Sequence, residues 1–116
     1  MDFRRQSLAD LAAEVRSGRV GARELVEHAL ERIDAVDSRI NAFVALDAEA
    51  ARSAARVVDE QVVRGEDAGA LAGIPIGVKD LEDAAGLSTT WGSAAWQGRE
   101  PATADSLFVS RLNAAG

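Results

Sequence analysis

The sequence predicts an α/β fold, and two features of its 116 residues lead to that prediction. In the first half, apolar residues recur with the three- and four-residue spacing of one helix face. Residues 74–78 then form a continuous apolar run, which is typical of a strand covered on both faces. We therefore expect helices packed around a sheet. We divide the chain into a helical region at 1–70 and the start of the core at 71–116.

Four helices are expected from capping signals and apolar spacing. Ser7 is a candidate N-cap for the first helix, and Gly18 and Gly21 bracket the turn to the second. Asp47 is a candidate N-cap for a third helix that runs to about residue 64. Thr103 or Asp105 is expected to cap the last helix. Residues 40–46, which are apolar and partly β-branched, are expected to form a strand or a buried connector.

Composition excludes several classes of function. Cysteine is absent, which excludes disulfides, thiolate metal sites and cysteine catalysis. His28 is the only histidine, so a multi-histidine metal site is impossible, and we expect it on a helix surface. The net charge of −6 argues against nucleic acid as the main partner. No apolar run is long enough to span a membrane and no signal peptide is visible, so we expect a cytoplasmic protein.

Lys79 is the main candidate for chemistry. It is the only lysine among 13 basic residues, and it follows the apolar run directly. Partial burial at a strand end favours the neutral form of a lysine amine, and a neutral amine can act as a general base toward a hydroxyl nucleophile. The alternative is a surface lysine paired with Asp80 or Asp83. The residues alone leave both interpretations open.

Other candidates have ordinary explanations beside functional ones. Trp91 and Trp96 flank a glycine and a serine, and they could line a pocket or, more commonly, pack in a core. The acidic residues at 80, 82 and 83 could bind a cation, although such clusters more often form a solvated loop. We expect no metal and no organic cofactor.

The run Leu-Ala-Gly-Ile-Pro-Ile-Gly-Val-Lys-Asp at 71–80 belongs to a longer pattern. It is followed by Gly-Leu at 86–87, Thr-Thr at 89–90 and Gly-Ser at 92–93. The closing stretch contains Thr-Ala-Asp-Ser at 103–106, Arg-Leu at 111–112 and Ala-Ala-Gly at 114–116. In order and spacing these residues resemble the amidase signature family. The resemblance is specific over 71–116 and weaker over the helices before it.

The resemblance implies a mixed sheet wrapped by helices and a Ser–cis-Ser–Lys triad. Lys79 matches the base of that triad, while Gly92 and Ser93 match positions that shape the site. The family's bridging and nucleophilic serines lie in later glycine- and serine-rich stretches, which this chain lacks, so Ser88 and Ser93 are not assigned as nucleophile. The implied reaction is hydrolysis of a small-molecule carboxamide to an acid and ammonia or an amine.

Two other functions stay open. One is the glutaminase subunit of a tRNA-dependent amidotransferase, although residues 80–83 resemble the general amidases more closely. The other is a non-catalytic helical binding module in which Lys79 is structural. We expect this chain to be an N-terminal piece truncated before the serine-rich part, inactive by itself and unable to fold stably alone. The substrate is not determined by the sequence, and a homo-oligomer is compatible with it.

Overall fold

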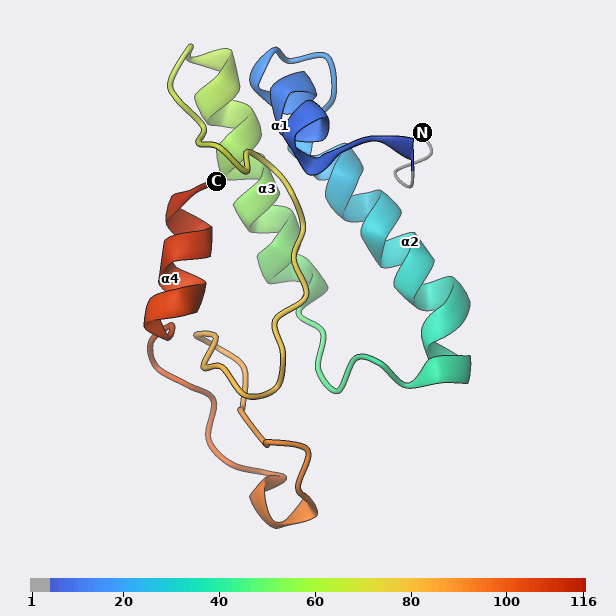
Figure 1. Ribbon diagram of the computed structural model, residues 1–116. Coiled ribbons are helices and arrows are strands. Elements are labelled where there is room, and N and C mark those ends of the chain that lie inside the picture. Colours follow the sequence, from blue (N-terminus) through green and yellow to red (C-terminus); the bar gives the residue numbers. More distant parts are fainter. Residues whose placement is uncertain (1–4) are drawn as a thin grey trace.

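The computed structural model describes residues 5–116. Its helices are α1 (Leu8–Arg16), α2 (Ala22–Ile40), α3 (Ala48–Val63) and α4 (Leu107–Ala114), with a short 3₁₀ turn, η2 (Ala94–Trp96). Figure 1 shows α2 and α3 side by side, α1 at their upper end, and α4 on the other side of α3. Between residues 5 and 116, no helix combines the length and the apolar character that crossing a membrane requires.

Local capping sets several of the helix ends. The Ser7 hydroxyl accepts a hydrogen bond from the Asp10 amide at 3.1 Å, and the Asp47 carboxylate accepts one from the Ala50 amide at 2.9 Å. Both caps confirm the sequence predictions, because each satisfies an amide that the first helical turn leaves unpaired. The cap predicted for the last helix was wrong. Ser106 is the N-cap of α4, and its hydroxyl accepts from the Val109 amide at 3.3 Å.

Side chains of α3 hold α2 in place. The N-terminus of α2 follows Gly21, which offers no side-chain cap. The Asp59 carboxylate of α3 accepts instead from the amides of Ala22 at 2.6 Å and Arg23 at 3.2 Å. Nearer the other end of α3, Arg52 donates from Nε and Nη2 to Glu27 of α2 at 2.7 and 3.0 Å. These two contacts fix the register of the helix pair.

The buried core lies where α1, α2 and α3 meet the segment that follows α3. Val15 and Leu25 are its largest fully enclosed side chains. Gly73 lies against α2 with φ +70°, and a Cβ built there would lie 2.7 Å from the Cβ of Ala22. Only glycine fits such a contact and this backbone conformation without strain. The close approach directs the chain beyond Gly73 along the helices toward Lys79.

Two predictions about extended structure were wrong for the described part of the chain. Residues 74–78 are irregular, and within 5–116 the backbone groups of 75–78 make no hydrogen bond. Since a strand is defined by pairing with a neighbour, the expected sheet is not seen here. Ile40 ends α2, and residues 41–47 form an exposed connector to α3 rather than a strand or a buried link.

Candidate active site

Lys79 follows the irregular segment at 74–78, at the point where the chain turns. Its carbonyl oxygen accepts from the amides of Leu81 at 2.7 Å and Glu82 at 3.1 Å. The side chain is exposed, so the burial expected from the sequence is not seen in residues 5–116. The alternative ion pair is not seen there either, because Lys79 makes no salt bridge with a described carboxylate.

The neighbouring carboxylate of Asp80 is held by a turn further along the chain. Its Oδ1 accepts from the Thr90 amide at 2.7 Å, and its Oδ2 accepts from the Thr90 hydroxyl and from the Gly92 amide at 3.4 Å. The hydrogen bond from the Thr90 hydroxyl, followed by that from the Thr90 amide, lowers the pKa of Asp80 below its usual value. Asp80 is therefore an anionic anchor for the 90–92 turn.

Asp83 is engaged in the same way. Thr89 is only 4% exposed, and its hydroxyl donates to the Asp83 carboxylate at 2.6 Å. The Asp83 carbonyl oxygen in turn accepts from the amide of Ser106, the N-cap of α4. Two of the three acidic side chains after Lys79 thus have threonine partners. Within residues 5–116, no cluster of three or more acidic or histidine side chains could hold a metal ion.

A second strip of chain supports the loop after Lys79. The Gly86 amide donates to the Ala102 carbonyl oxygen, and the Ala102 amide donates to the Leu87 carbonyl oxygen, both at 2.9 Å. The Asp105 carboxylate accepts from the Ala85 amide at 2.7 Å and from the Asn113 side chain at 2.9 Å. Asp105, predicted as a helix cap, therefore links this loop to α4.

An open cavity of about 420 Å³ lies beside Lys79. One wall is the connector at 42–45, and the other is formed by residues between 77 and 89, including Lys79, Glu82 and Ser88. Small-molecule sites have volumes of roughly 300–1,000 Å³ and combine apolar walls with a few polar groups. The space could accommodate a small ligand next to the Lys79 amine.

Gly92 and Ser93 lie near this site without lining its cavity. The Gly92 amide contacts Asp80, as described above. The Ser93 amide donates to the Thr90 carbonyl oxygen at 2.9 Å, and its hydroxyl accepts from the Ala95 amide at 3.3 Å. Their place is therefore in the turn that Asp80 anchors. Their predicted role in shaping the site stays a prediction.

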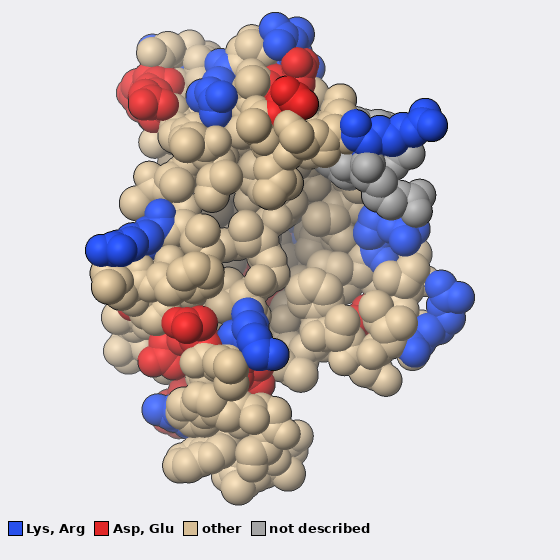
Figure 2. All heavy atoms as spheres, in the orientation of Figure 1, with Lys and Arg blue, Asp and Glu red and all other residues tan. Residues whose placement is uncertain are grey.

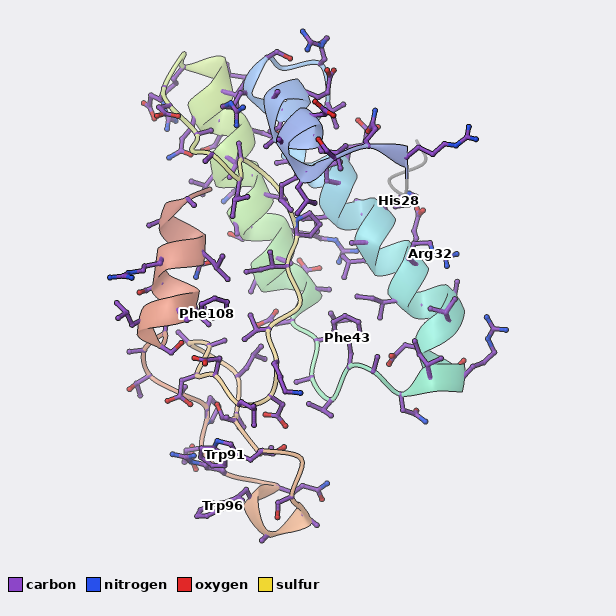
Figure 3. All side chains as sticks on the ribbon, viewed as in Figure 1. His28, Arg32, Phe43, Trp91, Trp96 and Phe108 are labelled. Atoms are coloured by element: carbon purple, nitrogen blue, oxygen red, sulfur yellow. The ribbon has the colours of Figure 1, made fainter. Side chains whose placement is uncertain are left out.

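The two tryptophans form a tip away from the core. Trp91 and Trp96 are 43% and 51% exposed, and their rings meet edge to face at 5.5 Å between centroids. The Arg99 guanidinium lies 4.7 Å from the Trp91 ring centroid. Figures 2 and 3 show this tip below the helices, with no charge on the 91–98 stretch. Within residues 5–116, the two tryptophans therefore do not pack in the core, which is the more common role for such residues.

The sequence analysis did not assign two side chains at the candidate site, Phe43 and Thr90, and a third residue, His28, has no part in it. Phe43 lines the cavity from the connector, which the sequence did not indicate because the contact spans distant segments. Thr90 could have been found, because the Thr-Thr pair is part of the pattern that resembles the family. His28, half-buried on α2, does not line the cavity (Figure 3).

Comparison with known proteins identifies the family of this chain. The family model described as Amidase matches residues 24–116. A glutamyl-tRNA(Gln) amidotransferase subunit from Salinispora arenicola is 44% identical over 115 residues, covering 99% of this chain and 23% of the relative. The AtzE subunit of 1-carboxybiuret hydrolase from a Pseudomonas species is 44% identical over 102 residues, covering 88% of this chain and 22% of the relative. The chain thus spans less than a quarter of the length of these relatives.

Solved structures agree with this assignment. A structure described as a vestigial complex that reveals the origins of an s-triazine catabolic enzyme matches with a TM-score of 0.90 and 40% identity, covering 96% of this chain and 24% of that one. A bacterial aryl acylamidase of the amidase signature family matches with a TM-score of 0.84 and 27% identity, covering 95% and 23%. The chain therefore belongs to the amidase signature family.

Proposed function

We propose that this chain is the N-terminal part of an enzyme that hydrolyses a small-molecule carboxamide, with Lys79 as the base. In this proposal residues 1–70 form a helical outer region and 71–116 begin the catalytic core. The observation that carries the proposal is the position of Lys79 beside an open cavity without a described carboxylate partner. The extent of the match, nearly all of this chain but 23% of the relative, supports a longer protein.

One feature of the surroundings of Lys79 supports its role as a base, which is the lack of a carboxylate partner among the described residues. A carboxylate in contact with an amine stabilises its ammonium form, which cannot accept a proton. The two aspartates nearest in sequence are instead held by threonines, Asp80 by Thr90 and Asp83 by Thr89. Glu82 also lines the cavity, but it makes no ion pair with Lys79. An arginine at position 79 would not serve, because a guanidinium does not lose its proton under working conditions.

In the proposed mechanism, neutral Lys79 takes a proton from a bridging serine, which takes one from the nucleophilic serine. Both serines come from the part of the enzyme beyond this chain. The nucleophile's oxygen bonds to the carbonyl carbon, and the C–N bond breaks as the amine leaves with the transferred proton. Water then cleaves the resulting ester, which releases the acid and restores the serine. No step requires a metal or an organic cofactor.

A second candidate function rests on the relatives. Those quoted above are named as parts of an amidotransferase and of a hydrolase, so both kinds of activity occur among similar proteins. As a glutaminase subunit, the full-length protein would use the same lysine but release ammonia from glutamine in the presence of partner subunits. Activity on simple carboxamides without any partner favours the amidase.

The test is ammonia release from acetamide, benzamide and glutamine by the full-length enzyme and its Lys79→Ala and Lys79→Arg variants. Loss of a general base lowers the rate by roughly 10²–10⁴-fold. We expect the kcat of both variants to fall by at least about 100-fold. Their circular dichroism spectra should match that of the wild type. Arg64→Ala, which removes an exposed cation outside the cavity, is the matched control and should leave kcat unchanged. A folded Lys79→Ala enzyme with wild-type turnover would refute the proposal.

A further inference from the structure

The connector between α2 and α3 places an aromatic ring beside the Lys79 segment. At the end of α2, Asn41 adopts the left-handed conformation with φ 48°. The Asp37 carboxylate then accepts from the amides of Ala42 at 2.8 Å and Phe43 at 3.1 Å. This pair of hydrogen bonds satisfies amides that follow the helix end, and it fixes the backbone from which Phe43 projects.

The Phe43 ring reaches the chain just before Lys79. A Cβ built on Gly77 would lie 3.7 Å from both Cε1 and Cζ of Phe43, which is ordinary van der Waals contact. The ring edge therefore lies near Gly77, at the distance that a side chain at this position would contact, and both Phe43 and Lys79 line the 420 Å³ cavity. Figure 3 shows Phe43 on the connector, between the lower parts of α3 and α2.

This proximity matters because backbone hydrogen bonds among the described residues do not position the segment that leads to Lys79. Within residues 5–116 the backbone groups of 75–78 make no hydrogen bond, so packing must position the segment there. The charged groups that share the cavity with Lys79 are Asp80 and Glu82, and the connector wall at 42–45 contributes none. Phe43 is thus the aromatic side chain of the uncharged wall of the cavity that Lys79 also lines.

We propose that Phe43 is a positioning residue for Lys79, because its ring supports the 77–79 backbone from which the amine projects. The inference rests on the proposed function, because it assigns to Phe43 a role in the activity of that base. Phe43 is 42% exposed, so its ring is also accessible to a substrate in the cavity.

The test compares Phe43→Ala and Phe43→Leu in the full-length enzyme, with Val63→Ala as control. Val63 is 87% exposed at the end of α3 and does not line the cavity. Small displacements of a catalytic group can cost up to about 100-fold in rate. We expect Phe43→Ala to lower kcat by about 10- to 100-fold with little change in KM.

Phe43→Leu keeps an apolar side chain of similar reach and should recover most of the lost kcat. Wild-type kcat for Phe43→Ala would overturn the inference. So would a loss of kcat that leucine does not rescue, because that pattern indicates only a structural role. If Phe43→Ala fails to fold, Phe43→Leu and Asp37→Ala supply the same comparison. Retained activity in Lys79→Ala refutes the proposed function itself, and is therefore distinguished from a failure at Phe43.

Discussion

At the scale of single residues, the hydrogen-bond partners of Asp80 determine whether its carboxylate is available to pair with the Lys79 amine. The carboxylate adjacent to Lys79 in sequence accepts three hydrogen bonds from residues 90 and 92, so its charge is stabilised by the turn rather than by the amine. The same residues place Trp91 in the left-handed region, with φ 51°. The Thr-Thr-Trp-Gly stretch thereby leaves Lys79 without a carboxylate partner within the described chain.

Replacing Thr90 by valine tests this arrangement. The hydroxyl makes the largest contribution to lowering the pKa of Asp80, so Thr90→Val should raise that pKa toward the ordinary aspartate value near 3.9. A depressed pKa stabilises the fold above the unfolded value and ceases to do so as pH falls through the folded value. The variant should therefore lose less stability than wild type on acidification from about pH 4.

The measurement is a carbon-13 titration of labelled aspartate in the full-length protein, with Asp80→Asn to assign the signal. Urea unfolding midpoints at neutral pH and near pH 3 provide the stability comparison. An Asp80 titration that is the same in wild type and Thr90→Val would show that the hydroxyl bond does not form in solution.

At the scale of elements, contacts between helices complete what the local sequence leaves open. Asp59 of α3 serves as the missing N-cap of α2. Removing a side-chain cap costs about 1 kcal/mol. Asp59→Ala should therefore lower the free energy of unfolding of the full-length protein by about that amount. Asp59→Asn, which keeps one acceptor oxygen, should lose less. Chemical denaturation measures both, and equal stability for alanine and wild type would contradict the cap.

Gly73 gives a stronger prediction for the packing of α2 against the following segment. Gly73→Ala introduces a Cβ 2.7 Å from the Ala22 Cβ at a φ of +70°. Overpacking alone costs about 1–3 kcal/mol, and a left-handed alanine adds to this. We expect a clear drop in melting temperature and a larger loss than for Gly86→Ala. Gly86 has a similar φ of +87° but open space around it, so the difference isolates the clash.

The sequence could predict those elements whose determinants are local. Ser7 and Asp47 were found because a cap and its helix are adjacent in the chain. The Asp59 cap and the Phe43–Gly77 contact join distant segments, and no spacing rule reveals them. The apolar run at 74–78 was identified correctly as the approach to Lys79, but a strand needs a paired neighbour and the described residues supply none. In the candidate site, the sequence indicated Lys79, whose role stays a prediction, but it did not indicate the residues around it.

At the scale of the whole chain, the buried core is small compared with the apolar surface left exposed. Much of the buried apolar set is alanine, at 12, 22, 55, 68 and 72. Exposed apolar side chains include Ile40, Leu46, Val57, Val63, Leu81, Leu107 and Phe108. Alanine burial removes little apolar area, and stabilisation by burial scales with that area. We therefore expect a core of this kind to give the isolated 116-residue chain little stability.

The isolated chain should therefore show no cooperative thermal transition. Calorimetry and circular dichroism on the monomeric chain measure this, and dye binding should report exposed apolar surface in the same sample. Helical signal without a calorimetric peak is the expected result, because helices form locally while tertiary packing does not. A sharp two-state transition of the isolated monomer would show that the described core is sufficient for folding.

The most direct test of the central claim is the reactivity of the serine that Lys79 is proposed to activate. A fluorophosphonate probe reacts only with an activated serine, and its second-order labelling rate on the full-length enzyme needs no knowledge of the substrate. The account predicts rapid labelling in wild type and in Arg64→Ala, and a fall of at least about 100-fold in Lys79→Ala and Lys79→Arg. Equal labelling of wild type and a folded Lys79→Ala protein would contradict the assignment of Lys79 as the base.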